Sequence, residues 1–142
     1  MPEIDKWLTQ MKEVGATDIH LTVGSPPKWR IHGDLEPIEG TEVLTNKAVA
    51  PLLQELCNEE QWESFLREHD LDFAYAIQGY ARFRTNYLMQ RWGMGAVLRM
   101  IPDEMLSFEQ LGLPNAVLQF VQMNFGLILV TGPTGSGKTT TL

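Results

Sequence analysis

The 142 residues carry a formal net charge of −7, with 44% hydrophobic and 20% charged residues, which is the balance of a soluble globular protein. The acidic balance argues against a nucleic-acid-binding protein, and the single cysteine, Cys57, excludes an internal disulfide framework and fits a reducing cytosol. No apolar run approaches the ~20 residues that span a bilayer, and the N-terminus lacks the pattern of a signal peptide, so we expect a cytoplasmic protein. The three histidines lie far apart in the sequence, so we expect no metal site.

The first 38 residues predict one helix and three strands. Apolar residues recur at helical spacing from Ile4 to Met11, and Gly15 provides a stop. Polar and apolar residues then alternate over 18–23, as in a half-buried strand. The segments 28–31 and 35–38 flank a turn and predict a hairpin.

Two helices and an antiparallel meander are predicted next. Thr45 is placed to cap a helix that contains Pro51. Asn58 and Gln61 have the spacing of a capping box, which predicts the start of a second helix. Three alternating stretches predict strands: 71–77, 80–89 and 95–101. The chain up to residue 101 is therefore predicted to be an α+β domain with an antiparallel sheet.

The remaining residues predict a connector and the opening of a second domain. Residues 102–112 are predicted to be a linker with a short helical piece at 107–111. Pro114 stands at the first turn of a further helix, and the apolar run 126–131 has the pattern of a buried strand. The parallel sheet that should flank this strand is missing, so we expect the segment to be misfolded, disordered or held by a neighbouring chain.

The residues that follow this run match the strand–GxxxxGK[ST]–helix signature of a P-loop. Glycines let backbone N–H groups converge on phosphate oxygens at a helix N-terminus. Lys138 would reach the β- and γ-phosphates, and Thr139 would place its hydroxyl on Mg²⁺. The pattern predicts a site for ATP and Mg²⁺ made of Gly132, Pro133, Thr134, Gly135, Ser136, Gly137, Lys138, Thr139 and Thr140.

A second feature is a row of polar residues on one predicted strand. Arg82, Arg84 and Asn86 lie two positions apart and therefore share a face, which Arg99 on the next strand can join. Guanidinium groups suit bidentate recognition of phosphate or carboxylate. A solvated sheet face with surface salt bridges has the same spacing, so the spacing leaves both interpretations open.

Asp18 and His20 share one face of the strand predicted at 18–23. A carboxylate beside an imidazole invites a catalytic interpretation, but no nucleophile motif accompanies the pair. We therefore favour a structural or interface role for both residues.

Five stretches along nearly the whole chain resemble the motifs of a known family, the type IV pilus retraction ATPases (PilT-like) of the secretion-ATPase superfamily. Their joint order and spacing is the evidence. The five stretches are 16–21 (ATDIHL), 24–35 (GSPPKWRIHGDL), 81–86 (ARFRTN), 98–102 (LRMIP) and 126–140 (GLILVTGPTGSGKTT). Thr17 and Thr139 stand where the family more often has serine.

The resemblance implies a PAS-like N-terminal domain joined to a RecA-like ATPase domain. It also implies a homohexameric ring, peripheral to the inner membrane and not inserted, that binds the pilus inner-membrane platform and acts on the pilin machinery. In this superfamily, arginines of the N-terminal domain approach the nucleotide phosphates, which favours a functional role for Arg82, Arg84 and Arg99.

The resemblance also sets the expected division of the chain. We expect a PAS-like domain at 1–101, a linker at 102–112 and the truncated start of a RecA-like ATPase domain at 113–142. The catalytic glutamate and the Walker B segment of the family would lie beyond Leu142, so we expect no catalytic residue within the chain and no activity from the chain alone. The alternatives are a pilus assembly or type II secretion ATPase, an unrelated P-loop kinase, and a stand-alone PAS-like interaction module.

Overall fold

The structure, a computed structural model, describes residues 2–101, 107–133 and 136–141, without the side chains of Thr139 and Thr140. Residues 102–106 of the predicted linker, and Thr134 and Gly135 of the predicted P-loop, lie outside the described residues. The chain divides into two compact units, 1–103 and 104–142, and each is described by itself.

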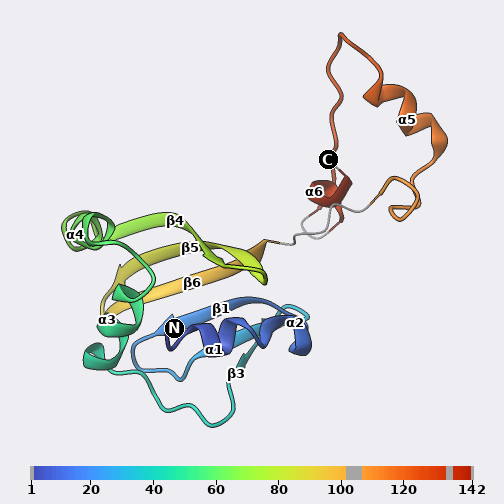
Figure 1. The fold of residues 1–142 in the computed structure, drawn as a ribbon. Helices are drawn as coiled ribbons and strands as arrows, with labels where there is room; N and C mark the ends of the chain where they lie inside the picture. The colour runs from blue at the N-terminus through green and yellow to red at the C-terminus, as the bar shows by residue number, and fades with distance from the viewer. Residues whose placement is uncertain (1, 102–106, 134–135, 142) are drawn as a thin grey trace. The chain divides into compact units, whose positions relative to one another are not determined.

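The first unit is built on one six-stranded antiparallel sheet with the strand order β3-β2-β1-β6-β5-β4 (Figure 1). The strands are β1 Ala16–Thr22, β2 Lys28–Ile31, β3 Asp34–Pro37, β4 Asp70–Ile77, β5 Ala81–Gln90 and β6 Gly93–Ile101. The pairing of β1 with β6 joins an N-terminal meander to a later one, from Asp18 opposite Arg99 to Thr22 opposite Gly95. This contact between distant segments makes one continuous sheet.

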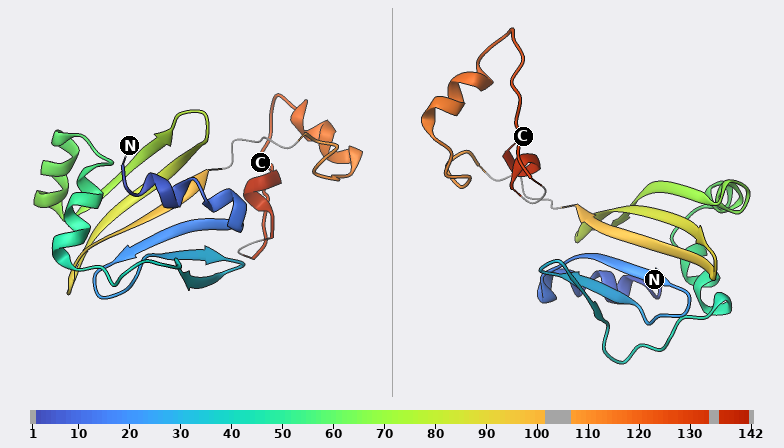
Figure 2. Two further views of the ribbon diagram at one scale, coloured as in Figure 1. Left: turned by 60° about the horizontal axis from the view of Figure 1, so that its bottom comes forward. Right: turned by 180° about the vertical axis from the view of Figure 1, so that it is seen from behind.

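Helices cover one face of this sheet (Figure 2). They are α1 Asp5–Leu8, α2 Met11–Val14, α3 Asn46–Gln54 and α4 Glu59–Glu68. The core lies between the two layers, where Leu53 of α3 and Phe65 of α4 are fully buried with Phe83 and Tyr87 of β5. The Phe65 and Tyr87 rings meet edge to face with centroids 5.4 Å apart, an arrangement that aromatic pairs favour. Burial of this face leaves the opposite face of the sheet to carry polar side chains.

The starts of α3 and α4 agree with the sequence. The Thr45 side chain accepts a hydrogen bond from the Ala48 backbone N–H at 3.3 Å. Asn58 accepts from the Gln61 N–H at 2.8 Å while the Gln61 side chain accepts from the Asn58 N–H at 3.0 Å. The predicted N-cap and the predicted capping box are therefore confirmed.

Two predicted helical segments are wrong in detail. The first helix is broken into α1 and α2, because the Thr9 hydroxyl donates to the Asp5 carbonyl at 2.8 Å and the backbone tightens at Gln10, whose N–H bonds Trp7 three residues back. The segment 107–111 forms turns rather than a helix, and Gly112 at φ 62° ends it.

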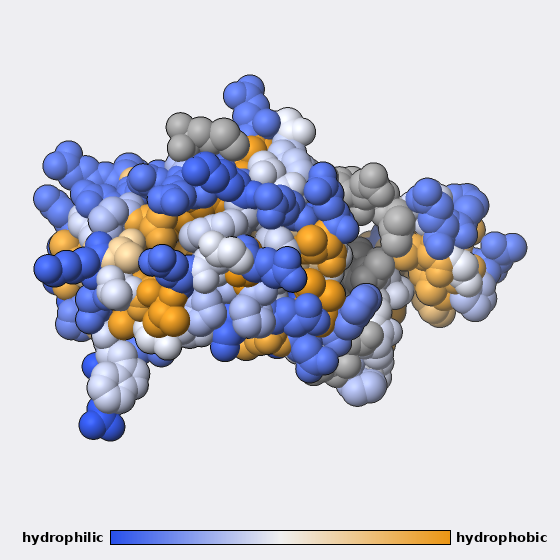
Figure 3. All heavy atoms as spheres, turned by 90° about the horizontal axis from the view of Figure 1, so that it is seen from below, coloured by the Kyte–Doolittle hydropathy of each residue, from blue (hydrophilic) through white to orange (hydrophobic). Residues whose placement is uncertain are grey.

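The second unit shows only part of what the sequence predicts. It contains α5 Asn115–Val121 and α6 Lys138–Thr141, and the strand predicted at 126–131 is not formed. A strand needs a hydrogen-bonded neighbour, and the described part of this unit supplies none. Leu127 and Leu129 are accordingly 83% and 74% exposed. Figure 3 shows one face of the molecule, on which hydrophobic residues (orange) reach the surface among hydrophilic ones (blue).

Candidate functional site

The helix-free face of the sheet gathers the basic residues of the strands. Directly opposed residues share a face, so the pairings of β1, β2, β4, β5 and β6 place every lysine and arginine of the six strands there. They are Lys28, Arg30, Arg82, Arg84 and Arg99. Only three carboxylates share this face, Asp18, Asp70 and Asp72. Five positive charges against three give the face a positive excess on a chain whose net charge is −7.

The predicted arginine row forms as the alternation indicated. Residues 81, 83, 85 and 87 of β5 are buried against the helices, whereas Arg82 and Arg84 are exposed on the other face. Arg99 of β6 lies directly opposite Arg84. Two guanidinium groups from neighbouring strands therefore occupy facing positions.

These two arginines line a shallow hollow of about 240 Å³ on the open face, together with Asp72, Asn86 and Val97. The lining carries two positive charges and one negative charge, with an amide group beside them. A hollow of this chemistry is suited to an anion that accepts several hydrogen bonds.

Asp72 fixes the guanidinium group of Arg84. Arg84 Nε donates to Asp72 Oδ2 at 3.0 Å, and Nη2 donates to the same oxygen. The hydrogen bond from Arg84, with the charge of its guanidinium group, holds the pKa of the Asp72 carboxyl below its usual value. Asn86 is held in a similar way, since its Nδ2 donates to Asp70 at 3.2 Å.

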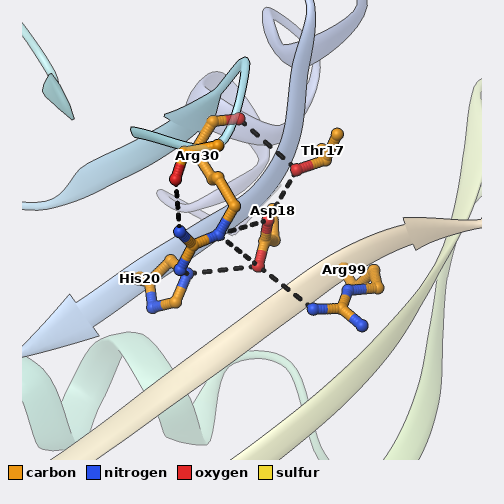
Figure 4. A network of polar contacts seen from close by, with 6 residues as sticks. Thr17, Asp18, His20, Arg30 and Arg99 are labelled. Atoms are coloured by element: carbon orange, nitrogen blue, oxygen red, sulfur yellow. Dashed lines mark hydrogen bonds and ion pairs between the residues drawn. The ribbon is translucent and has the colours of Figure 1, made fainter. Parts of the chain in front are cut away.

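A second cluster surrounds Asp18 in the middle of the sheet (Figure 4). The Asp18 side chain is only 1% exposed and accepts a hydrogen bond from Thr17 Oγ1 at 2.6 Å. Arg30 Nε lies 3.3 Å from Asp18 Oδ2, and Arg99 Nη2 lies 3.5 Å from Oδ1. The carboxylate thus has a guanidinium group on each side, one from β2 and one from β6.

The His20 ring lies between two partners with opposite requirements. Its Nε2 is 3.1 Å from Asp18 Oδ1, which needs a donor, and 3.2 Å from Arg30 Nη2, which needs an acceptor. Burial alone would raise the pKa of Asp18, but hydrogen bonds from Thr17 and His20 and the charges of His20 and Arg30 outweigh it. The pKa of this carboxyl therefore lies below its ordinary value.

Two glycines of the predicted P-loop that the structure describes, Gly132 and Gly137, have backbone conformations that favour glycine. A Cβ added to Gly132 would meet Ser136 Oγ at 2.6 Å, and Gly137 has a positive φ of 84°. The Lys138 ammonium group donates to the carbonyl oxygens of Gly132 and Pro133 at 2.8 and 2.6 Å. The lysine therefore points back over the loop that precedes it. The predicted roles of Thr134, Gly135 and the hydroxyls of Thr139 and Thr140 lie outside the described residues.

The described residues hold neither a metal-binding cluster nor a membrane-spanning helix. Over 2–101, 107–133 and 136–141, no group of three or more His, Cys, Asp and Glu residues is arranged to hold a metal ion. Within the same residues, no helix has the length and apolar character required to cross a membrane.

Sequence reasoning identified the arginines but missed the partners that hold them. Asp18 and Arg99 are 81 positions apart, and only the pairing of β1 with β6 brings them together. The sequence pattern alone does not identify Arg30 as a partner of Asp18. The signal that could have indicated it is its position in a predicted strand next to the one that carries Asp18.

Known proteins resemble the chain along nearly its whole length. The type II/IV secretion system protein family matches residues 1–142. The type IV pilus retraction ATPase PilT of Pseudomonas aeruginosa is 40% identical over 140 residues, which are 99% of this chain and 40% of that protein. The type IV pilus ATPase PilU of the same organism is 33% identical over 140 residues, which are 99% of this chain and 36% of that protein.

A solved structure has the same fold. The crystal structure of the pilus retraction motor PilT with bound ADP matches with a TM-score of 0.82 at 38% identity, over 96% of this chain and 40% of that chain. The chain therefore spans at most about two fifths of the length of these relatives.

Proposed function

Since the chain belongs to the type II/IV secretion system protein family and is of the PilT-like kind, we propose that it is the N-terminal part of an ATP-driven motor that powers the retraction of type IV pili. Of the two pilus ATPases compared above, the retraction ATPase is the more similar, at 40% identity against 33%. Because the chain spans about 40% of that relative, the activity belongs to the whole motor rather than to these 142 residues.

The P-loop is the observation that carries this proposal. Gly132 and Gly137 support a phosphate cradle, because both have a positive φ, a backbone conformation that favours glycine. With ATP bound, Lys138 would exchange its carbonyl partners for phosphate oxygens, and Thr139 would offer its hydroxyl to the Mg²⁺ ion that accompanies ATP. The ATP–Mg²⁺ complex supplies the phosphoryl group for hydrolysis, and residues 132–140 bind and orient it.

The arginines of the first unit supply the second part of the proposed site. Arg84 and Arg99 line the hollow on the open face and bind the nucleotide phosphates, and Arg82 lies two residues before Arg84 on the same face. Guanidinium groups are suited to this task because each offers several donors in a fixed plane. Their charge also stabilises the negative charge of the transferring phosphoryl group.

The assembly and the partners follow from the proposed family role. The motor forms a homohexameric ring, with a PAS-like first domain and a RecA-like ATPase domain. It lies on the cytoplasmic side of the inner membrane without inserting into it, and it transmits force to the pilus platform and the pilin machinery. The positive excess of the open face supports an anionic ligand there.

The experiment that tests the proposed function uses the complete gene product that contains this chain. We expect Lys138→Gln to weaken ATP binding at least tenfold and to abolish hydrolysis, because a charge-assisted contact to the phosphates is lost. Lys47→Gln on the exposed surface of α3 is the matched control and should leave both unchanged. ATP binding and hydrolysis that are indifferent to Lys138→Gln would contradict the proposal.

The direction of the motor is tested in cells. Deletion of the gene should leave surface pili present but unable to retract, as judged by the length of labelled pili over time. Loss of the pili themselves would assign the protein to pilus assembly, and normal secretion and retraction would favour a stand-alone interaction module.

A further inference from the structure

The position of Asp18 suggests a role that the proposed nucleotide site does not include. β1 lies between β2 and β6, so Asp18 stands opposite Arg30 on one side and opposite Arg99 on the other. Its side chain is 1% exposed, and a buried carboxylate is stable only when donors satisfy its oxygens. The Asp18 carboxylate is therefore held in one position by its hydrogen-bond donors, on a sheet face that is otherwise exposed to solvent.

The two arginines beside Asp18 are held differently. Arg30 donates from Nη1 to the Gly33 carbonyl at 2.8 Å, and its Nε lies 3.3 Å from Asp18 Oδ2, so this guanidinium group is occupied by the protein. Arg99 reaches Asp18 through Nη2, while its side chain remains 67% exposed and lines the hollow. Of the two, Arg99 is the one through which Asp18 can affect a ligand.

Arg99 and Arg84 occupy directly opposed positions, and like charges at such positions repel. The repulsion is reduced because each guanidinium group has a carboxylate beside it, which Arg99 shares with Arg30. Asp72 holds Arg84, with Nε to Oδ2 at 3.0 Å, and Asp18 holds Arg99 from the other flank. The two carboxylates let the guanidinium groups face one hollow without being driven apart.

We propose that Asp18 is a positioning residue, which orients the guanidinium group of Arg99 toward the hollow so that Arg99 and Arg84 together bind the phosphates of the nucleotide. The inference rests on the proposed function, since it assumes that the hollow receives phosphate. Thr17, His20 and Arg30 hold Asp18 in place, so the side chains around it form the support of the site. An arginine fixed before binding loses less side-chain entropy when the ligand arrives.

The test uses pyrophosphate as the probe and the side-chain Nε–H resonances of the arginines as the readout, in the 142-residue chain. In the natural chain, pyrophosphate should shift the resonances of both Arg84 and Arg99. Asp18→Asn should weaken pyrophosphate binding about tenfold, which corresponds to the loss of one charge-assisted contact. It should also make the Arg99 Nε–H group more mobile when no anion is present.

If Asp18 acted only through its negative charge, Asp18→Asn would have the opposite effect on the affinity for pyrophosphate. Asp18→Asn removes a negative charge next to the hollow, so a carboxylate that is merely a counter-charge would give equal or tighter binding in the variant. That result would overturn the proposal. Asp72→Asn is the matched control, because it removes the carboxylate from Arg84 and should leave the mobility of Arg99 unchanged.

Two further variants complete the design. In an Arg99→Gln background, Asp18→Asn should cause no additional loss of affinity, because Asp18 acts through Arg99; a second loss of similar size would contradict this. If Asp18→Asn fails to fold, Thr17→Val removes one hydrogen bond from the carboxylate and keeps its charge, and Arg99 should again become more mobile.

The failure of the inference can be told from the failure of the proposed function. If pyrophosphate shifts neither arginine in the natural chain, phosphate binding at the hollow is refuted, and the anion-free mobility of Arg99 still reports on Asp18. If pyrophosphate binds normally but Arg99 is equally ordered in the Asp18→Asn variant, the positioning role alone is refuted.

Discussion

Asp18 makes the stability of the first unit depend on pH. Its pKa in the folded chain lies below the ordinary carboxyl value because of the hydrogen bonds and charges around it. A carboxyl with a lowered folded pKa stabilises the fold fully above its unfolded pKa of about 4, and this contribution is lost as the pH falls through the folded value.

We expect the Asp18→Asn variant to be less stable than the natural chain at pH 6 and the difference to shrink below about pH 4. At low pH the natural carboxyl is protonated, and it then resembles the amide of the variant. Urea unfolding of both proteins between pH 6 and pH 3 measures the difference in their free energies of unfolding. Asp72 also has a lowered pKa, but it is present in both proteins, so its effect cancels in this difference. A difference that does not change with pH would show that the charge of Asp18 contributes nothing to stability.

At the scale of elements, the capping box of α4 is a local device whose contribution can be measured. Asn58→Ala removes the acceptor for the Gln61 N–H and should lower the free energy of unfolding by about 1 kcal/mol. Asn58→Asp keeps an acceptor and adds a negative charge at the helix N-terminus, so it should restore most of the loss. Chemical denaturation of the three proteins tests this, and equal loss in both variants would contradict a capping role.

The sequence predicted elements whose causes are local. The caps at Thr45 and Asn58 and the alternation of β5 depend on residues a few positions apart, and these predictions are confirmed. The sequence did not predict the break between α1 and α2, because the break depends on the hydrogen bond that the Thr9 hydroxyl donates to the Asp5 backbone carbonyl. The run 126–131 was predicted to be a strand from its hydrophobicity, but a strand also requires a partner.

The same distinction explains which parts of the site were foreseen. Arg82 and Arg84 share a face by the period of a single strand, so the sequence places them together. The cluster of Asp18, Arg30 and Arg99 depends on the register of β1 with both β2 and β6. The alternation within one strand does not reveal how that strand pairs with a strand distant along the chain, so the carboxylate beside Arg99 is evident only in the folded sheet.

At the scale of the whole molecule, the proposed function assigns contacts with phosphate to both units. The second unit carries the predicted P-loop with Lys138, and the first unit carries a sheet face with an excess of positive charge. If one nucleotide contacts both, its binding and hydrolysis couple the two units. Such coupling is what a motor requires in order to convert ATP hydrolysis into movement of one domain against another.

The ATPase activity of arginine variants of the complete gene product tests this claim most directly. Arg84→Gln and Arg99→Gln should each lower the rate of ATP hydrolysis about a hundredfold or more, whereas Arg67→Gln, an exposed arginine on α4 paired with Glu68, should change it less than twofold. Hydrolysis at the natural rate in both open-face variants would contradict the proposal that the first unit completes the nucleotide site.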